Sequence, residues 1–281
     1  MRLVKSLVER CLDLISLLSE QAELLPLGDI AARLEMPKSA AHRLLATFCE
    51  LGWAEQDPQT GFYRLTLRLA IAGQRLLVGT RIPDICQPVL DELAAATESL
   101  GRLAIVGPDG LTWIAHAQGA RTGLVYQPGL VARVPLHITA NGKAWLSTLP
   151  HQDALRLAVE SGLGQPGIGG PRAIRTRETF SAALDETRER GWGMAFEEAE
   201  PGVAAIAAPI MQNGLTVGTV SIAGPIHRFT GPSLEALASR LLNAAHTLSE
   251  RWPYRVTRVA HSCQVAWIVN NEGALPDKAA V

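Results

Sequence analysis

The sequence predicts an α+β protein with a small helical unit at its amino-terminal end and a larger domain built on antiparallel sheet. Apolar residues recur at helical spacing through residues 7–51. Further along the chain, alternating runs flank tight turns such as Asn213-Gly214, a pattern that is typical of hairpins. The chain of 281 residues also exceeds the usual domain of about 100 to 150 residues, which favours two domains.

The first helices are predicted from a cap and from apolar stripes. Ser6 is a candidate N-cap for the first helix. Two shorter amphipathic helices follow and meet at a turn that contains Met36 and Pro37, which is the arrangement of a helix-turn-helix unit. The predicted apolar stripe of the first helix is Val8, Cys11, Leu12, Ile15 and Leu18, and that of the third is Ala41, Leu44, Leu45, Phe48 and Leu51.

The opposite face of the third helix carries groups that can contact DNA. Side chains on this face can reach phosphates and base edges if the helix enters a major groove. The net charge of −1 argues against binding of nucleic acid by bulk charge, so a local basic face must carry the contact, and its modest charge favours paired use in a dimer. The candidate DNA-binding residues are Lys38, Ser39, His42, Arg43, Thr47 and Arg64.

A hairpin and a further helix are predicted after the helix-turn-helix unit. Trp53–Gln56 and Phe62–Leu65 are predicted strands on either side of a turn at residues 57–61, which makes the unit winged. Leu65–Arg81 is rich in Leu, Ile and Ala with an arginine every few residues, which predicts a linker helix. This helix packs either against the same helix of a partner or on its own chain.

The rest of the chain alternates helices and strands without the regularity of a parallel sheet. Pro83 opens this domain, and its first helix is expected to end near Leu100. Two antiparallel hairpins are predicted, one from 102–106 with 111–117 and one from 205–211 with 216–222. The other predicted elements are helices at 140–149, 152–161, 177–191 and 232–251 and a strand at 264–269, followed by a disordered tail from residue 270.

Several motifs in a fixed order carry a resemblance to one family. They are the helix-turn-helix stretch at 30–53, the stretch from Val134 to Leu146, Glu197-Glu198 followed by Gly202, and the runs 206–210 and 220–225. In this order they resemble the IclR family of bacterial transcriptional regulators over residues 5–252.

The resemblance implies a domain layout. It implies a winged helix-turn-helix DNA-binding domain at residues 1–65, a linker and dimerisation helix at 66–82, and a GAF-like effector-binding domain with helices on an antiparallel sheet at 83–252. Residues 253–281 lie beyond the resemblance, and we assign them no role.

The turn Thr139-Ala140-Asn141-Gly142 precedes an apolar helical run and is a candidate anion site. The first-turn N–H groups of a helix lack intrahelical acceptors and attract anions, helped by the helix dipole. The same turn also suits an ordinary helix capped by Thr139. The resemblance favours the first interpretation, because this turn in IclR-type regulators holds effector carboxylates, and it implies that Ala140, Asn141 and Gly142 bind the effector.

Further effector-site positions are implied by the resemblance. Ser221 matches a position whose hydroxyl contacts small oxo acids. Ala195, Ala205 and Ala223 stand where such members place an acidic or polar residue, a cysteine and a second serine. Since each buried ligand group without a partner costs about 1–3 kcal/mol, the three alanines favour a bulky or aromatic carboxylate over glyoxylate or pyruvate.

Other residues near this site have two interpretations each. Trp113 and Leu136 are candidate walls for an aromatic ring, although either suits an ordinary core. Glu197 and Glu198 are expected to begin a surface turn, with the alternative that one of them reaches a ligand hydroxyl.

Metal, cofactor and membrane functions lack their signatures. The four cysteines have no C-x-x-C spacing, so no metal is expected. The chain has no H-E-x-x-H, no G-x-S-x-G and no dinucleotide-binding loop, so no cofactor is expected. The glycine-rich stretch 162–170 lacks the Lys-Ser/Thr of a phosphate loop, and we interpret it as a mobile surface loop. No apolar stretch reaches the roughly 20 residues that cross a bilayer, and no signal-peptide core is present, which predicts a cytoplasmic protein.

Together these observations predict a ligand-responsive transcriptional regulator of IclR type. Its expected partners are a double-stranded DNA operator, a small-molecule carboxylate and further copies of the chain in a homodimer or homotetramer. The alternative is an enzyme, a small-molecule transferase, that uses the winged helix as a dimerisation module.

Overall fold

The chain divides into two compact units, residues Met1–Gly79 and Thr80–Val281. The computed structural model describes residues 5–21, 23–108, 110–120 and 134–253 and the backbone of 255–258 and 265–268. Within these ranges no helix is long and apolar enough to span a membrane.

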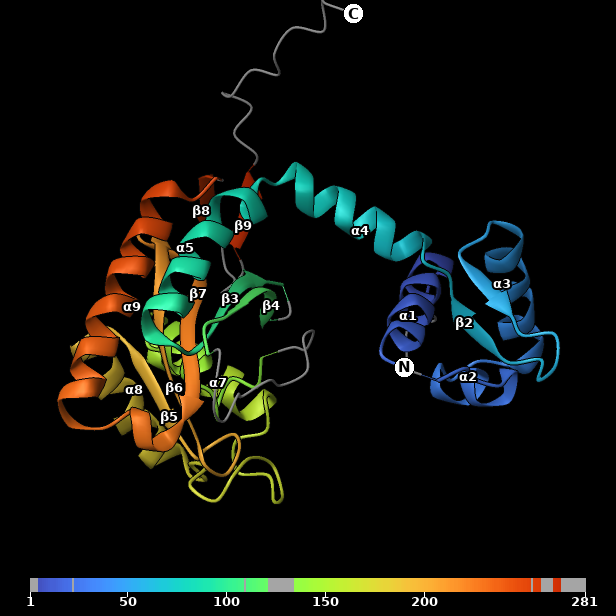
Figure 1. Ribbon diagram of the computed structural model, residues 1–281. Coiled ribbons are helices and arrows are strands. Elements are labelled where there is room, and N and C mark those ends of the chain that lie inside the picture. The colour runs from blue at the N-terminus through green and yellow to red at the C-terminus, as the bar shows by residue number, and fades with distance from the viewer. Residues whose placement is uncertain are drawn as a thin grey trace, which may run out of the picture. The chain divides into compact units, whose positions relative to one another are not determined.

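The first unit is a winged helix-turn-helix followed by a helix (Figure 1). Its core forms where the three helices meet the two strands, around Leu14, Ile30, Leu45 and Tyr63. Tyr63 also pairs with Leu25 through two backbone hydrogen bonds. The elements are α1 (Leu7–Ser19), α2 (Leu27–Arg33), α3 (Lys38–Glu50), β1 (Ala54–Gln56), β2 (Tyr63–Leu65) and α4 (Arg68–Gly79).

The predicted cap of α1 is confirmed, whereas part of its predicted stripe is wrong. The Glu9 amide donates to Ser6 Oγ and the Ser6 amide donates to the Glu9 carboxylate, which is a complete capping box. Leu14 and Leu18 are buried, but Val8 and Leu12 are 67% and 58% exposed. Because α1 is apolar on more than one side, helical spacing alone did not decide which side meets α2 and α3.

The predicted stripe of α3 fails only at its last member. Leu51 is 57% exposed because α3 ends at Glu50, and the chain turns at Leu51 and Gly52 before β1. The predicted linker helix is present as α4, and it buries none of its residues. Thr80 and Arg81 separate it from α5 (Ile82–Thr97), and Arg81 has a left-handed backbone with φ of 57°.

The second unit is built on a five-stranded antiparallel sheet in the order β4-β3-β7-β6-β5. The two predicted hairpins are confirmed as β3–β4 and β6–β7, while the short strand β5 was missed. The strands are β3 (Leu100–Gly107), β4 (Gly110–Gln118), β5 (Gly193–Phe196), β6 (Val203–Gln212) and β7 (Leu215–Pro225). A separate pair joins β8 (Arg255–Arg258) to β9 (Val265–Ile268), so the strand predicted at 264–269 has a partner that was not predicted.

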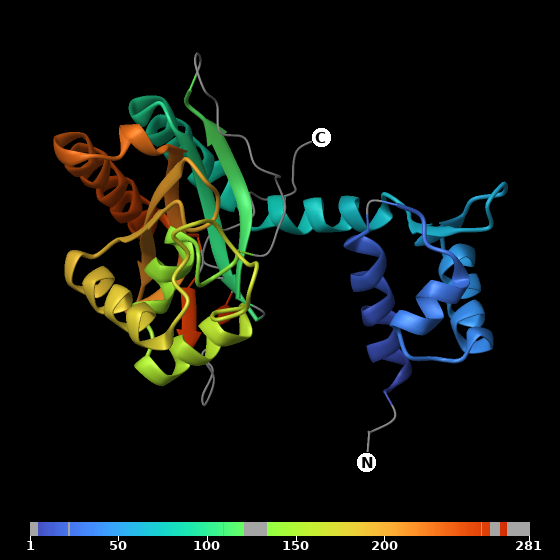
Figure 2. The same ribbon diagram turned by 90° about the horizontal axis from the view of Figure 1, so that it is seen from below.

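Helices cover both faces of the sheet (Figures 1 and 2). On one face α5 and α9 pack against side chains such as Leu103, Ile206 and Val220. On the other face α6, α7 and α8 pack against Ala104 and its neighbours. These helices are α6 (Ala140–Leu146), α7 (His151–Glu160), α8 (Arg177–Arg190) and α9 (Gly231–Arg251), and a 3-10 turn at Ile226–Arg228 precedes α9.

Candidate functional site

The face of α3 predicted to contact DNA is exposed as a whole. Ser39, His42, Arg43 and Thr47 are all exposed, and the opposite side buries Ala41, Leu44, Leu45 and Phe48. Thr47 Oγ1 donates to the Arg43 carbonyl at 3.1 Å, so its hydroxyl proton is already engaged within the helix. α3 therefore presents one polar, positively charged side to solvent.

Two basic candidates flank this face. Lys38 begins α3 and is exposed. Arg64 on β2 donates through Nε to Glu55 on β1 at 2.5 Å, across the strand pair of the wing. This exposed ion pair reduces the net charge of the wing, so a phosphate would compete with Glu55 for Arg64.

The predicted anion turn lies at the start of α6 and is buried. Thr139 is its N-cap, as the alternative interpretation had it, and Thr139 Oγ1 accepts from the Gly142 amide at 3.1 Å. The cap therefore takes one of the three candidate N–H groups. Those of Ala140 and Asn141 remain the first-turn donors that no intrahelical acceptor reaches.

Glycines let α6 sit directly on its neighbours. A Cβ at Gly142 would lie 2.0 Å from the Leu136 carbonyl oxygen, and a Cβ at Gly193 on β5 would lie 2.5 Å from that of Ala140. Asn141 Nδ2 donates to Thr219 Oγ1 on β7 at 2.9 Å. The candidate turn is thereby fixed to the sheet by backbone packing and by one buried side-chain hydrogen bond.

The other predicted effector positions share the α6 face of the sheet. Ala195 pairs with Ala205, and Ala205 pairs with Ala223, so the three alanines form one cross-strand row. Ser221 lies in the next row, and it is buried. Strand register, which the sequence did not reveal, thus brings these four residues together beneath α6.

Lys143 and Glu198 form a buried ion pair that sequence reasoning missed. Lys143 Nζ donates to both Glu198 carboxylate oxygens at 2.6 Å and to the Met194 carbonyl at 3.0 Å. The two side chains are 3% and 10% exposed, so Glu198 does not belong to a surface turn as predicted. Burial lowers the pKa of Lys143 and raises the pKa of Glu198, and the charge of each partner opposes these shifts.

The glycine-rich stretch 162–170 is exposed at residues 164–167, as expected of a surface loop, while its two ends are packed. The Gly170 amide donates to the Glu198 carbonyl at 2.7 Å, and Gly162 lies against the ring of His137. His137 is 1% exposed, and neither ring nitrogen makes a regular hydrogen bond to the described residues. Burial, followed by the charges of Arg175 and Lys143, lowers the pKa of His137, which favours the neutral ring.

The two candidate wall residues differ in their surroundings. Leu136 is buried among Val134, Trp145 and other apolar side chains, which is a core position. Trp113 on β4 is partly buried, and the guanidinium carbon of Arg102 on β3 lies 4.3 Å from the centroid of its ring. Arg102 is itself buried, and sequence reasoning did not single it out.

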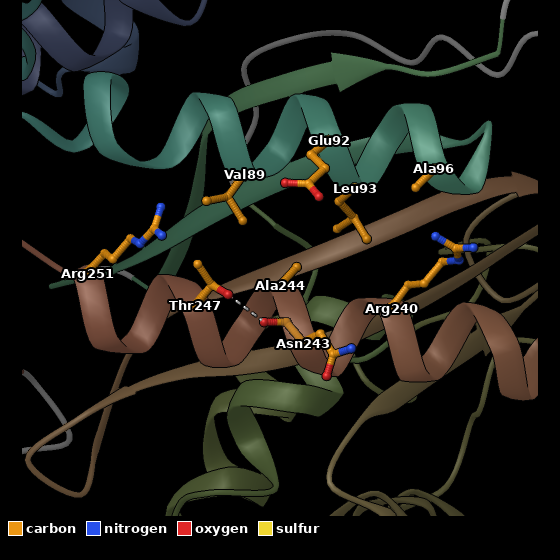
Figure 3. Close-up of a pocket in the computed structure, with 9 residues that line it drawn as sticks. All are labelled: Val89, Glu92, Leu93, Ala96, Arg240, Asn243, Ala244, Thr247 and Arg251. Carbon is orange, nitrogen blue, oxygen red and sulfur yellow. Dashed lines mark hydrogen bonds between the residues drawn. The ribbon is translucent and has the colours of Figure 1, made fainter.

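Two hollows lie on the second unit, and the first includes one predicted effector position, Leu136. One of about 460 Å³ is lined by Leu136, Ser161 and Ile168, among others. Another of about 310 Å³ lies between α5 and α9, where Val89 and Leu93 point from α5 toward α9 and Arg240 and Arg251 stand at opposite ends (Figure 3). The second hollow is on the face of the sheet opposite to α6, so it does not include the predicted effector positions.

No metal site is evident within the described ranges, where no three His, Cys, Asp or Glu side chains are grouped to hold an ion.

Comparison with known proteins assigns the chain to a family. The family model described as "Bacterial transcriptional regulator IclR C-terminal" matches residues 74–250, and that described as "IclR helix-turn-helix domain" matches residues 7–58. The chain belongs to the IclR family.

Individual members of the IclR family match nearly the whole chain. The HTH-type transcriptional regulator XynR of Escherichia coli is 30% identical over 249 residues, which cover 88% of this chain and 97% of XynR. An IclR transcriptional regulator from Alicyclobacillus acidocaldarius has a TM-score of 0.73 and 24% identity, covering 86% of this chain and 97% of its own. An IclR homologue from Microbacterium hydrocarbonoxydans, solved in complex with 4-hydroxybenzoate, has a TM-score of 0.72 and 19% identity. The match covers 88% of this chain and 99% of the homologue.

Proposed function

We propose that this IclR-type regulator binds a double-stranded DNA operator through α3 and the β1–β2 wing, and that its second unit binds a bulky or aromatic carboxylate. The observation that carries the DNA part is the division of α3 into two faces. Leu44 and Phe48 are buried, whereas His42 and Arg43 are exposed. Groups that can read base edges therefore stand on the side of the helix that faces solvent.

Arg43→Ala tests the DNA part. We expect specific operator affinity to fall about 5- to 150-fold, because a base contact is typically worth about 1–3 kcal/mol. The DNA is a duplex selected from random sequence by the wild-type protein, and affinity is measured by fluorescence anisotropy at matched salt. Arg177→Ala, an exposed arginine on α8 in the second unit, is the control and should bind as wild type does. Unchanged affinity of Arg43→Ala would remove this residue from the interface.

We further propose that the linker, residues 66–82, holds two copies of the chain together in a homodimer, or in a homotetramer built from it. No residue of α4 is buried, and its apolar residues Ile71 and Val78 are 51% and 53% exposed. These two residues are seven apart, two helical turns, and thus lie on one face. Leu7, Val8 and Leu12 add exposed apolar surface on α1 of the same unit. A second copy of these helices would remove this surface from water.

A dimer of this kind constrains the operator. Two winged helices related by a two-fold axis require a pseudo-palindromic site, whose half-sites lie about one helical turn or a multiple of it apart. Since the whole chain has a net charge of only −1, pairing two weak basic faces supplies affinity that one face lacks.

The proposed effector site is the α6 face of the sheet around Ser221 and the row of Ala195, Ala205 and Ala223. The alanine side chains are small and apolar, which favours a ligand with an apolar body, and Ser221 offers a hydroxyl. A protein of the same fold, the Microbacterium homologue, was solved with the aromatic acid 4-hydroxybenzoate, which supports a ligand of this size in this fold.

Ala223→Phe tests the effector site. We expect it to abolish binding of the carboxylate that stabilises the wild-type protein most in a thermal-shift panel, because the phenyl ring would occupy the position proposed for the ligand. Calorimetry gives the affinity. Ala236→Phe, at an exposed position of α9, is the control and should bind normally. If Ala223→Phe folds and binds the acid as the wild type does, the ligand lies elsewhere.

A further inference from the structure

Strand register places a buried arginine on the proposed effector face. Arg102 on β3 is directly opposite Ser221 on β7, and Ser221 is opposite Ala207 on β6. Residues directly opposite each other in an antiparallel pair point to the same side of the sheet. Thr219, one row further along, points to α6, since it accepts the hydrogen bond from Asn141. Arg102, which is 7% exposed, therefore lies on the α6 face beside Ser221.

The guanidinium of Arg102 packs against the ring of Trp113. The ring centroid lies 4.3 Å from the guanidinium carbon, which is stacking distance. A stacked guanidinium keeps its N–H groups in its own plane, where two of them match a carboxylate. Trp113 Nε1 is buried and has no acceptor among the residues that the structure describes, so it is a further donor next to this plane.

The second buried cation of this face is already neutralised. Lys143 directs its N–H groups to the two carboxylate oxygens of Glu198 and the carbonyl of Met194. A ligand carboxylate would have to displace Glu198 to reach Lys143, and it would leave that acid buried without its partner. Arg102 carries five N–H donors, so it can donate to a carboxylate at one edge while its other N–H groups keep acceptors of their own.

We propose that Arg102 is the residue that recognises the acid group of the effector, with two parallel hydrogen bonds to one carboxylate, and that Trp113 positions it. This inference rests on the proposed function, in which a carboxylate binds this face of the sheet. In this arrangement the first-turn amides of α6 do not bind the acid group of the effector and are left for a second polar group of the ligand.

The geometry also indicates the size of the ligand. Strands are about 4.8 Å apart, so Ala207 on β6 lies about 10 Å from Arg102 across β7, and Ala205, two residues further along β6, lies about 12 Å away. A one-ring acid extends over the alanine row from a carboxylate held at Arg102. Glyoxylate can bind Arg102 but is too short to contact the row of Ala195, Ala205 and Ala223 as well. We therefore expect ring carboxylates to bind more tightly than two- or three-carbon oxo acids.

The test compares two stacked arginines of the full-length protein. Arg102→Gln removes the proposed anion contact. The control, Arg190→Gln, removes an arginine whose guanidinium carbon lies 4.7 Å from the centroid of the Trp192 ring and whose Nε donates to the Trp192 carbonyl. The probes are benzoate, 4-hydroxybenzoate and cyclohexanecarboxylate, with benzamide as the uncharged match and glyoxylate as the small acid. Calorimetry measures affinity, and circular dichroism verifies folding.

The expected outcome is that at least one ring acid binds the wild type and the Arg190→Gln variant equally. Its affinity should fall about 10- to 100-fold in Arg102→Gln. The loss should be smaller in Arg102→Lys, which keeps the positive charge but cannot donate two parallel hydrogen bonds to one carboxylate. The preference for benzoate over benzamide should disappear in Arg102→Gln.

Two results overturn the inference in different ways. If a ring acid binds folded Arg102→Gln as tightly as the wild type, the role of Arg102 is wrong, while the proposed carboxylate effector stands. If no carboxylate binds the wild type at millimolar concentration, both the inference and the proposed effector class are wrong.

Discussion

Lys143→Met should destabilise the second unit by about 3–5 kcal/mol, because it leaves the Glu198 carboxylate buried without its counter-charge. The side chain of Lys143 is 3% exposed, and two of its three hydrogen bonds go to Glu198. Methionine fills a similar volume, so the loss reports the charge rather than a cavity. Urea unfolding followed by tryptophan fluorescence and circular dichroism measures the change.

Two further variants isolate the cause. Lys143→Met combined with Glu198→Leu removes both charges and should recover most or all of the lost stability, since a buried ion pair often contributes little compared with apolar side chains. Lys5→Met breaks the exposed pair between Lys5 and Asp13 and should leave stability nearly unchanged. A single Lys143→Met variant as stable as the wild type would mean that Glu198 is accommodated without the lysine.

Ile71→Glu should separate the proposed dimer and thereby lower operator affinity by a factor of at least about 100. The substitution places a charge in the exposed apolar stripe of α4, where a second copy would have to bury it. Loss of the dimer removes the intramolecular advantage of the second winged helix. Analytical ultracentrifugation gives the mass at micromolar concentration, and anisotropy with the selected duplex gives the affinity.

Ala72→Glu is the matched control for this experiment. It introduces the same charge at the next position of α4, which helical spacing places well away from the side of Ile71 and Val78. Ala72→Glu should remain dimeric and bind DNA. Dimeric Ile71→Glu would exclude this stripe from the interface, and a wild-type protein that is monomeric while protecting one half-site would contradict the dimer altogether.

The features that were predicted correctly from sequence depend on neighbours within a few residues. Ser6 caps α1 because Glu9 stands three residues later, and Asn213-Gly214 closes a hairpin because both residues adopt the left-handed backbone that the turn requires. The exposed face of α3 followed from helical spacing alone.

The features that were missed depend on pairings between distant parts of the chain. Glu198 looked like part of a surface turn because its partner, Lys143, is 55 residues away. The side of the sheet on which Arg102 lies is set by the register of β3 with β7, for which no local pattern exists. Val8 and Leu12 were expected in the core, since spacing shows that a stripe is apolar but not whether the same chain covers it.

The short joint between α4 and α5 limits how the two units can influence each other. Only Thr80 and Arg81 connect the two helices along the chain, Arg81 has a left-handed backbone with φ of 57°, and Pro83 has no amide hydrogen. Mechanical work that passes along the chain from one unit to the other must therefore act through the torsions of two residues. Glycine at position 81 would relieve the strain of the left-handed backbone, while both proposed binding surfaces keep their residues.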